Sequence, residues 1–94
     1  MAFARAVTFE GVSADRAAQI REEMKDMEQP EGLPAREILM LHDAGAETSL
    51  VLIFFDTEED YARGDEILNA MPAGDTPGRR TSVTRYEVVA RRSV

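Results

Sequence analysis

LVLIFF, residues Leu50–Phe55, is the most apolar stretch of the 94-residue chain. Successive side chains of a strand point to opposite faces, so Leu50, Leu52 and Phe54 share one face and the three residues that alternate with them share the other. An apolar run of this kind needs burial on both sides. The stretch therefore predicts a central strand of a sheet.

An extended run over residues 36–42 (REILMLH) precedes this strand, and Asp43–Ala46 (DAGA) joins the two. Two strands joined by a four-residue turn that contains glycine predict a β-hairpin. The apolar side chains of residues 36–42 also alternate between the two faces. Both strands of the hairpin therefore offer apolar groups to both sides of the sheet.

The segments that flank the hairpin read as one strand and one helix on each side. Ser13 and Thr57 are suited to capping the two helices, because a hydroxyl accepts a hydrogen bond from an otherwise unpaired amide of the first turn. Proline and glycine in residues 29–34 and 72–78 mark loops. The expected elements are a strand over residues 2–10, a helix over 14–28, strands over 36–42 and 50–55, a helix over 57–70 and a strand over 81–89.

This order, β-α-β-β-α-β, predicts an α+β fold of the ferredoxin-like kind over a single domain, residues 1–94. Its sheet has four antiparallel strands, with the first and third in the middle and both helices on one face. Two helices leave the other face bare. Five large apolar side chains left in water there would cost about 10 kcal/mol, comparable with the stability of a whole domain. A second copy of the chain, packed sheet to sheet, is the expected cover.

Charge limits the possible partners. The chain has 11 Lys and Arg against 18 Asp and Glu, a net charge of −7, which argues against nucleic acid and anionic membranes as partners. Residues 79–94 are the exception, with five Arg and one Glu, a net +4. A basic end on an acidic body indicates docking on that body or on a second copy of it.

Several classes of site and location are excluded by what the sequence lacks. It has no cysteine, which excludes disulfides, thiol nucleophiles and thiolate metal sites. No spaced set of histidines supports zinc, and no P-loop or dinucleotide fingerprint occurs. The first residues do not read as a signal peptide, and no apolar run reaches the roughly 18 residues of a membrane span. We expect a cytoplasmic protein without metal or cofactor.

In these features the chain resembles the dimeric α+β-barrel superfamily, which includes antibiotic-biosynthesis-monooxygenase-like and stress-responsive barrel proteins. The element order, the LVLIFF strand after the DAGAE turn, the helix opening DTEEDYARGDEI and the final strand TSVTRYEVVARR carry the resemblance. It implies a homodimer with a pocket between helices and sheet that takes a small, mostly apolar ligand. Members include cofactor-independent oxygenases, haem-degrading enzymes, isomerases and proteins without known activity, so whether the chain is an enzyme stays open.

The catalytic residues of the monooxygenase and haem-degrading members cannot be carried over, because the family pattern has an Asn on the first strand, a Trp, and a His or Tyr lining the pocket. This chain has no Trp, and its single Asn is Asn69, near the end of the second helix. The remaining candidates for chemistry are His42, Tyr61 and Arg5. His42 titrates near neutrality and could act as a general base, but a histidine at a strand end is more often a hydrogen-bonded surface residue. Arg5, on a buried strand, needs either a carboxylate of the protein or an anionic ligand, and of the two we favour an ion pair with Glu87.

Four residues are candidates for ligand binding: Tyr61, Gly64, Leu68 and Tyr86. Gly64 falls on the apolar stripe of the second helix, where glycine costs about 1 kcal/mol relative to alanine. It makes room either for close contact between helix and sheet or for a gap that holds a ligand. The acidic residues Asp60, Asp65 and Glu66 are expected on the solvent side of that helix.

Overall fold

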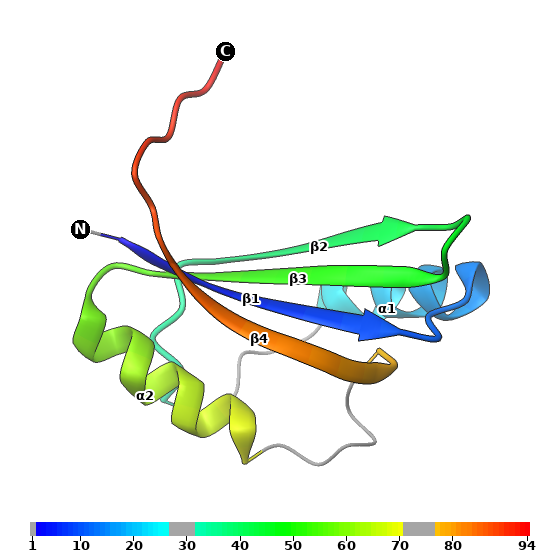
Figure 1. Ribbon diagram of the computed structural model, residues 1–94, viewed down its shortest axis with the longest axis horizontal. Coiled ribbons are helices and arrows are strands. Elements are labelled where there is room, and N and C mark those ends of the chain that lie inside the picture. Colours follow the sequence, from blue (N-terminus) through cyan, green and yellow to red (C-terminus); the bar gives the residue numbers. More distant parts are fainter. Residues whose placement is uncertain (1, 27–31, 71–76) are drawn as a thin grey trace.

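The protein is a four-stranded antiparallel sheet with two helices on one of its faces (Figure 1). The computed structural model describes residues 2–26, 32–70 and 77–94. The strands lie in the order β2-β3-β1-β4, so the first and third are central, as expected. The ferredoxin-like α+β fold is confirmed. Its elements are β1 (Phe3–Glu10), α1 (Ala14–Asp26), β2 (Glu37–Asp43), β3 (Thr48–Phe55), α2 (Glu58–Asn69) and β4 (Arg79–Glu87).

Both helices begin at the hydroxyl caps predicted from the sequence. Ser13 Oγ accepts a hydrogen bond from the backbone N–H of Arg16 at 3.1 Å, and Thr57 Oγ1 accepts one from the N–H of Asp60 at 3.0 Å. Residues 27 and 28 of the expected first helix, and parts of both expected loops, lie outside the described residues. The caps fix where each helix leaves the sheet.

The last strand is two residues earlier than expected, running over Arg79–Glu87 instead of residues 81–89. A register shift opposite Thr8 and Phe9 lets β4 pair with β1 as far as Glu10, whose carboxylate forms an ion pair with Arg79. The alternation of polar and apolar residues in β4 does not mark this start, because Arg79 and Arg80 are both charged. At the other end, the N–H of Val88 still donates to the carbonyl of Ala2 at 2.9 Å.

The face of the sheet that meets the helices holds the core. From β3 it receives Val51, Ile53 and Phe55, and the last two are 5% and 0% exposed. Phe55 packs with Tyr61 of α2, Leu33 and Ile53 in one cluster. A second cluster lies toward the hairpin end of the sheet and includes Val7, Phe9 and Val12, with Ala17 of α1 against it.

The opposite, helix-free face carries Leu50, Leu52 and Phe54 of β3, together with Leu39 and Leu41 of β2. Leu39 and Leu41 are 42% and 51% exposed. The C-terminal segment rises from this side of the sheet, away from the helices (Figure 1). Within the described chain, this face is therefore apolar and largely uncovered.

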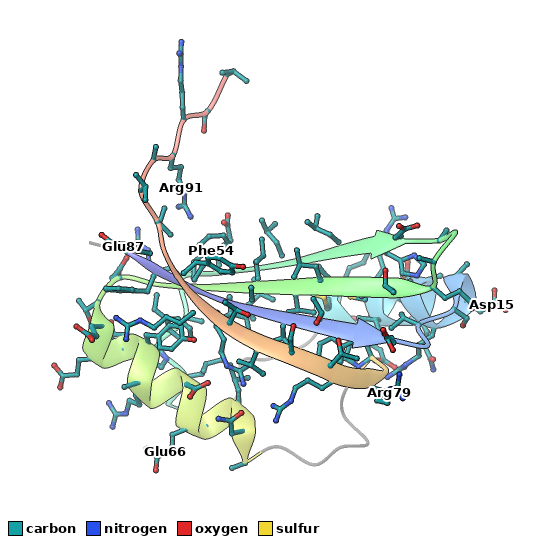
Figure 2. The ribbon with its side chains drawn as sticks, viewed as in Figure 1. Asp15, Phe54, Glu66, Arg79, Glu87 and Arg91 are labelled. Carbon is teal, nitrogen blue, oxygen red and sulfur yellow. The ribbon has the colours of Figure 1, made fainter. Side chains whose placement is uncertain are left out.

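Arg91 of the C-terminal segment, residues 88–94, contacts this face. The Arg91 guanidinium lies 4.9 Å from the centre of the Phe54 ring and 3.7 Å from Glu37, as Figure 2 shows for Arg91 and Phe54. Beyond it the segment is extended, and Val94 is fully exposed. The basic end, residues 79–94, thus docks on its own body through ion pairs of Arg79 with Glu10, Arg85 with Glu58 and Arg91 with Glu37. The residues beyond Arg91 project outward.

Candidate functional site

An apolar cavity lies between α1, α2 and the helix-covered face of the sheet, with a volume of about 200 Å³. Both helices and the strands β1, β2 and β3 contribute apolar side chains to it. The first helix meets the sheet through a narrow stripe, and Ile20 is its one buried residue. The first helix therefore stands over the sheet without filling the space beneath it. The apolar walls include Val7, Phe9, Ile20, Met40, Ile53 and Leu68.

Arg5 brings a charge into this cavity from the centre of β1. The residue is 3% exposed. Its Nε donates to Asp65 Oδ1 at 2.8 Å and its Nη2 to Asn69 Oδ1 at 2.9 Å. A buried guanidinium needs such partners, because removing it from water without them is costly.

The expected ion pair between Arg5 and Glu87 is wrong. In the observed register Glu87 stands opposite Phe3, and Arg5 stands opposite Arg85. Arg5 reaches instead across to α2, where Asp65 is half-buried. The prediction that Asp65 lies on the solvent side of α2 is wrong for the same reason, whereas Glu66 does point away from the sheet (Figure 2).

Two guanidinium groups meet at one amide oxygen. Asn69 Oδ1 accepts from Arg5 Nη2 and also from Arg80 Nη1, the latter at 3.1 Å. Both arginines line the cavity, as do Arg16 and Glu23 of α1. Among the described lining residues, three cations therefore face one carboxylate in a protein whose net charge is −7.

Gly64 lies where α2 crosses β3, away from the described lining of the cavity. A Cβ at this position would overlap the Cε1 and Cζ atoms of the Phe55 ring. The sequence left open whether Gly64 allows close helix–sheet contact or makes a gap for a ligand. In the structure it allows the close helix–sheet contact. The Phe55 ring occupies the space that a ligand would need there.

Tyr61 belongs to the same packed end of α2. Its ring meets Phe55 edge to face, with centres 5.5 Å apart and planes at 74°. The Arg85 guanidinium lies 5.5 Å from the Tyr61 ring centre and 4.7 Å from that of Phe3. Burial, with a smaller contribution from the Asp65 carboxylate, raises the pKa of Tyr61, while Arg5 and Arg85 act in the opposite direction.

The other sequence candidates are dispersed. Leu68 lines the cavity, one turn along α2 from Gly64. Tyr86 lies on β4 opposite Ala4, on the helix-free face, and is 56% exposed. Arg5 and Tyr61 lie within electrostatic reach of each other. Of these residues, the structure brings Arg5 and Leu68 together at the cavity.

His42 sits at the hairpin end of β2. Its Nε2 donates to the backbone carbonyl of Val12 at 2.8 Å, so it ties β2 to the loop before α1. Ser49 is its cross-strand neighbour, yet the buried Ser49 Oγ has no hydrogen-bond partner among the described residues. The two side chains do not form a nucleophile–base pair.

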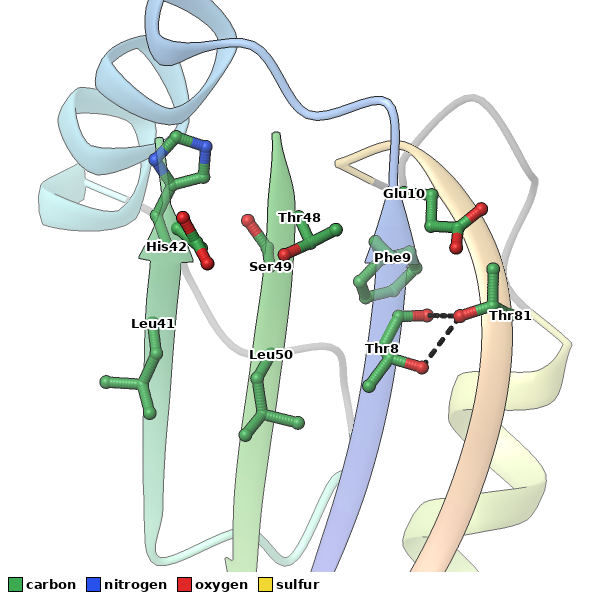
Figure 3. Close-up of a pocket in the computed structure, with 10 residues that line it drawn as sticks. Thr8, Phe9, Glu10, Leu41, His42, Thr48, Ser49, Leu50 and Thr81 are labelled. Carbon is green, nitrogen blue, oxygen red and sulfur yellow. Dashed lines mark hydrogen bonds between the residues drawn. The ribbon is translucent and has the colours of Figure 1, made fainter. Parts of the chain in front are cut away.

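A shallow hollow at this end of the sheet is shown in Figure 3. Its lining includes Glu10, Thr8 and Thr81. The two threonine hydroxyls are 2.8 Å apart and bond to each other, and the Glu10 carboxylate pairs with Arg79. These polar groups satisfy one another, whereas Ser49, which also lines the hollow, has a buried hydroxyl without a hydrogen-bond partner among the described residues.

Within residues 2–26, 32–70 and 77–94, no group of three or more His, Asp or Glu side chains is placed to hold a metal ion. Over the same residues, neither helix has the length and apolarity needed to cross a membrane.

Sequence reasoning missed the lining residues Arg16 and Arg80, and it missed Asp65 and Asn69 as the partners of Arg5. One signal was present, since Asp65 and Asn69 are four residues apart and so share a face of α2. That face is the one that carries Leu68 toward the sheet, and an acid and an amide there could have been matched to the buried Arg5. A scan against protein-family models, a search of curated proteins and a search of solved structures each found no match for this chain.

Proposed function

We propose that the protein is a homodimeric α+β barrel that binds a small, mostly apolar ligand in the cavity between its sheet and helices. The observation that carries the proposal is the cavity itself, which apolar side chains from both helices and three strands line. Ligand sites are typically concave and apolar, with few polar groups. A volume of about 200 Å³ suits a ligand smaller than a typical drug.

The helix-free face supports the dimer. Four strands spaced about 4.8 Å apart and about eight residues long give a flat area of roughly 500 Å². A stable interface needs about 800 Å² from each partner. The extended C-terminal segment, which rises on the same side, supplies further surface for contact with a second copy. Its arginines also complement the acidic body of that copy.

The dimer is tested with two strand substitutions of matched exposure on opposite faces. Leu41 lies on the helix-free face and is 51% exposed, whereas Val83 lies on the helix side of β4 and is 38% exposed. Leu41→Asp should convert the dimer to a monomer in sedimentation equilibrium at micromolar concentration. Val83→Asp should leave the dimer intact. A wild-type monomer, or equal effects of the two substitutions, would contradict the proposed interface.

Ligand binding is tested with indole, a small neutral probe, by NMR of the methyl groups. Saturable shifts are expected at Ile53 and Leu68, which line the cavity. Val89 is 89% exposed outside the sheet and serves as the control methyl. The absence of saturable shifts at the two cavity residues would refute ligand binding.

The alternative is a protein of the same fold that holds no ligand because its own side chains fill the interior. The contact of Gly64 with Phe55 favours this alternative at one end of α2. The indole experiment separates the two, since a filled interior gives no saturable response.

A further inference from the structure

We infer that the ligand of this cavity carries an acidic group, and that Arg5 and Arg80 receive it. The inference rests on the proposed function and specifies the class of ligand: one or two apolar rings, or an equivalent alkyl body, with a single carboxylate. This ligand class follows from where the charges of the cavity lie and from how each is compensated.

Two of the three arginines have a carboxylate partner. Arg5 is paired with Asp65. Arg16 lies 3.9 Å from Glu23, at the edge of ion-pair distance, and donates to Gln19 at 2.9 Å. These two pairs contribute no net charge to the cavity.

The third, Arg80, is compensated differently. Its recorded contact among the described residues is with the neutral amide oxygen of Asn69, which also accepts from Arg5. Two guanidinium groups therefore lie within 3.1 Å of one uncharged oxygen. Like charges held this close repel each other, and an anion beside them would be attracted by both.

The chemistry of guanidinium groups fits a carboxylate at this point. Each guanidinium has five N–H donors arranged in a planar fork that matches the two oxygens of a carboxylate. The recorded contacts of Arg5 use Nε and Nη2, and that of Arg80 uses Nη1. The apolar walls of Val7, Ile53 and Leu68 lie in the same cavity and suit the body of the ligand.

The rest of the protein repels such a ligand. With a net charge of −7, the surface disfavours the approach of an anion. A cavity with a surplus of positive charge then favours an acid over its neutral analogue, whereas the rest of the surface does not. This contrast makes the preference measurable against a matched neutral probe.

The experiment compares 2-naphthoate with naphthalene-2-carboxamide, which has the same rings and no charge. Affinities are measured by NMR titration, following the methyl groups of Ile53 and Leu68. We expect 2-naphthoate to bind at least tenfold more tightly at low salt, and its advantage to shrink as salt is added.

Arg80 is exposed, so Arg80→Gln is the informative variant; Arg5 is buried, and its replacement puts the fold at risk. Arg80→Gln should weaken 2-naphthoate binding three- to tenfold and leave carboxamide binding unchanged. Arg79→Gln is the matched control, because Arg79 is the neighbour on β4 that pairs with Glu10. It should leave both affinities as in the wild type.

The outcomes separate this inference from the proposed function. If both probes bind the cavity equally well, or if Arg80→Gln and Arg79→Gln behave alike, the acidic ligand is refuted while ligand binding stands. If neither probe shifts Ile53 or Leu68, the proposed function falls together with the inference.

Discussion

Replacing Gly64 by alanine tests how tightly α2 is set against the sheet. An alanine in the middle of a helix normally stabilises it by about 1 kcal/mol relative to glycine. Here the added methyl group would overlap two atoms of the Phe55 ring and lie 3.3 Å from a third, Cδ1. Two opposing effects therefore act at this one position.

The packing cost should exceed the helix gain. Phe55 is 0% exposed, and its ring is held edge to face by Tyr61, so the ring has little room to turn. Overpacking of a core costs about 1–3 kcal/mol, and overlap with two ring atoms belongs near the upper end. After the helix gain is subtracted, Gly64→Ala should destabilise the protein by about 2 kcal/mol. For a domain of this size, that lowers the midpoint of thermal unfolding by about 8–16 °C.

Urea unfolding followed by circular dichroism measures the effect, and a second substitution identifies its cause. Phe55→Leu removes the ring atoms that the new methyl group meets. In that background Gly64→Ala should become stabilising by about 1 kcal/mol, as at an ordinary helical site. If Gly64→Ala stabilises the wild-type protein, the helix is not pressed against the ring and the reasoning is refuted.

Three further perturbations test the charges and polar groups of the core. Asp65→Ala should lower the free energy of unfolding by about 2 kcal/mol in urea, because it leaves the buried Arg5 without its carboxylate. This loss is smaller than for a fully buried ion pair, because the Asp65 side chain is 36% exposed. The control is Glu66→Ala, on the exposed side of the same helix, which should change stability by less than about 0.5 kcal/mol. Ser49→Ala should be neutral or stabilising by up to about 1 kcal/mol, because its buried hydroxyl lacks a partner among the described residues, and a clear loss of stability would show that this hydroxyl is bonded. The raised pKa of Tyr61 means that the unfolded chain ionises this residue first, so its contribution to stability should be fully present below about pH 10 and be lost as the pH rises above that value. Tyr61→Phe should therefore make urea midpoints fall less steeply above about pH 10.

The fold could be predicted because several local signals agree. The apolar run in β3, the glycine turn before it and the hydroxyl caps at Ser13 and Thr57 each indicate the same order of elements. Which face of β3 meets the helices could not be predicted, since both faces are apolar and strand periodicity treats them alike. The structure assigns Val51, Ile53 and Phe55 to the helices through the packing of Phe55 on Tyr61.

The site was harder to predict than the fold, because its polar contacts depend on which face of α2 lies against the sheet. The parity of β1 places Arg5 on the same face as Val7, but the partner of Arg5 is set by contacts between elements 60 residues apart in sequence. From the expected strand pairing, Glu87 was the acidic residue nearest to Arg5. In the observed register, Glu87 lies opposite Phe3 instead. Asp65 and Asn69 become partners only once the helix is in place over the strand.

The position of Arg5 in the middle of a central strand is poorly explained by stability alone. Apolar side chains of similar size often replace a buried ion pair with no loss of stability, or with a gain of about 1–4 kcal/mol. Apolar residues in place of both Arg5 and Asp65 would also close the cavity further against α2. Keeping a guanidinium there, and adding Arg80 at the same Asn69 oxygen, concentrates positive charge at one point of an acidic protein. Such an arrangement suits the recognition of an anion better than it suits packing, which ties the charge of the cavity to its proposed ligand.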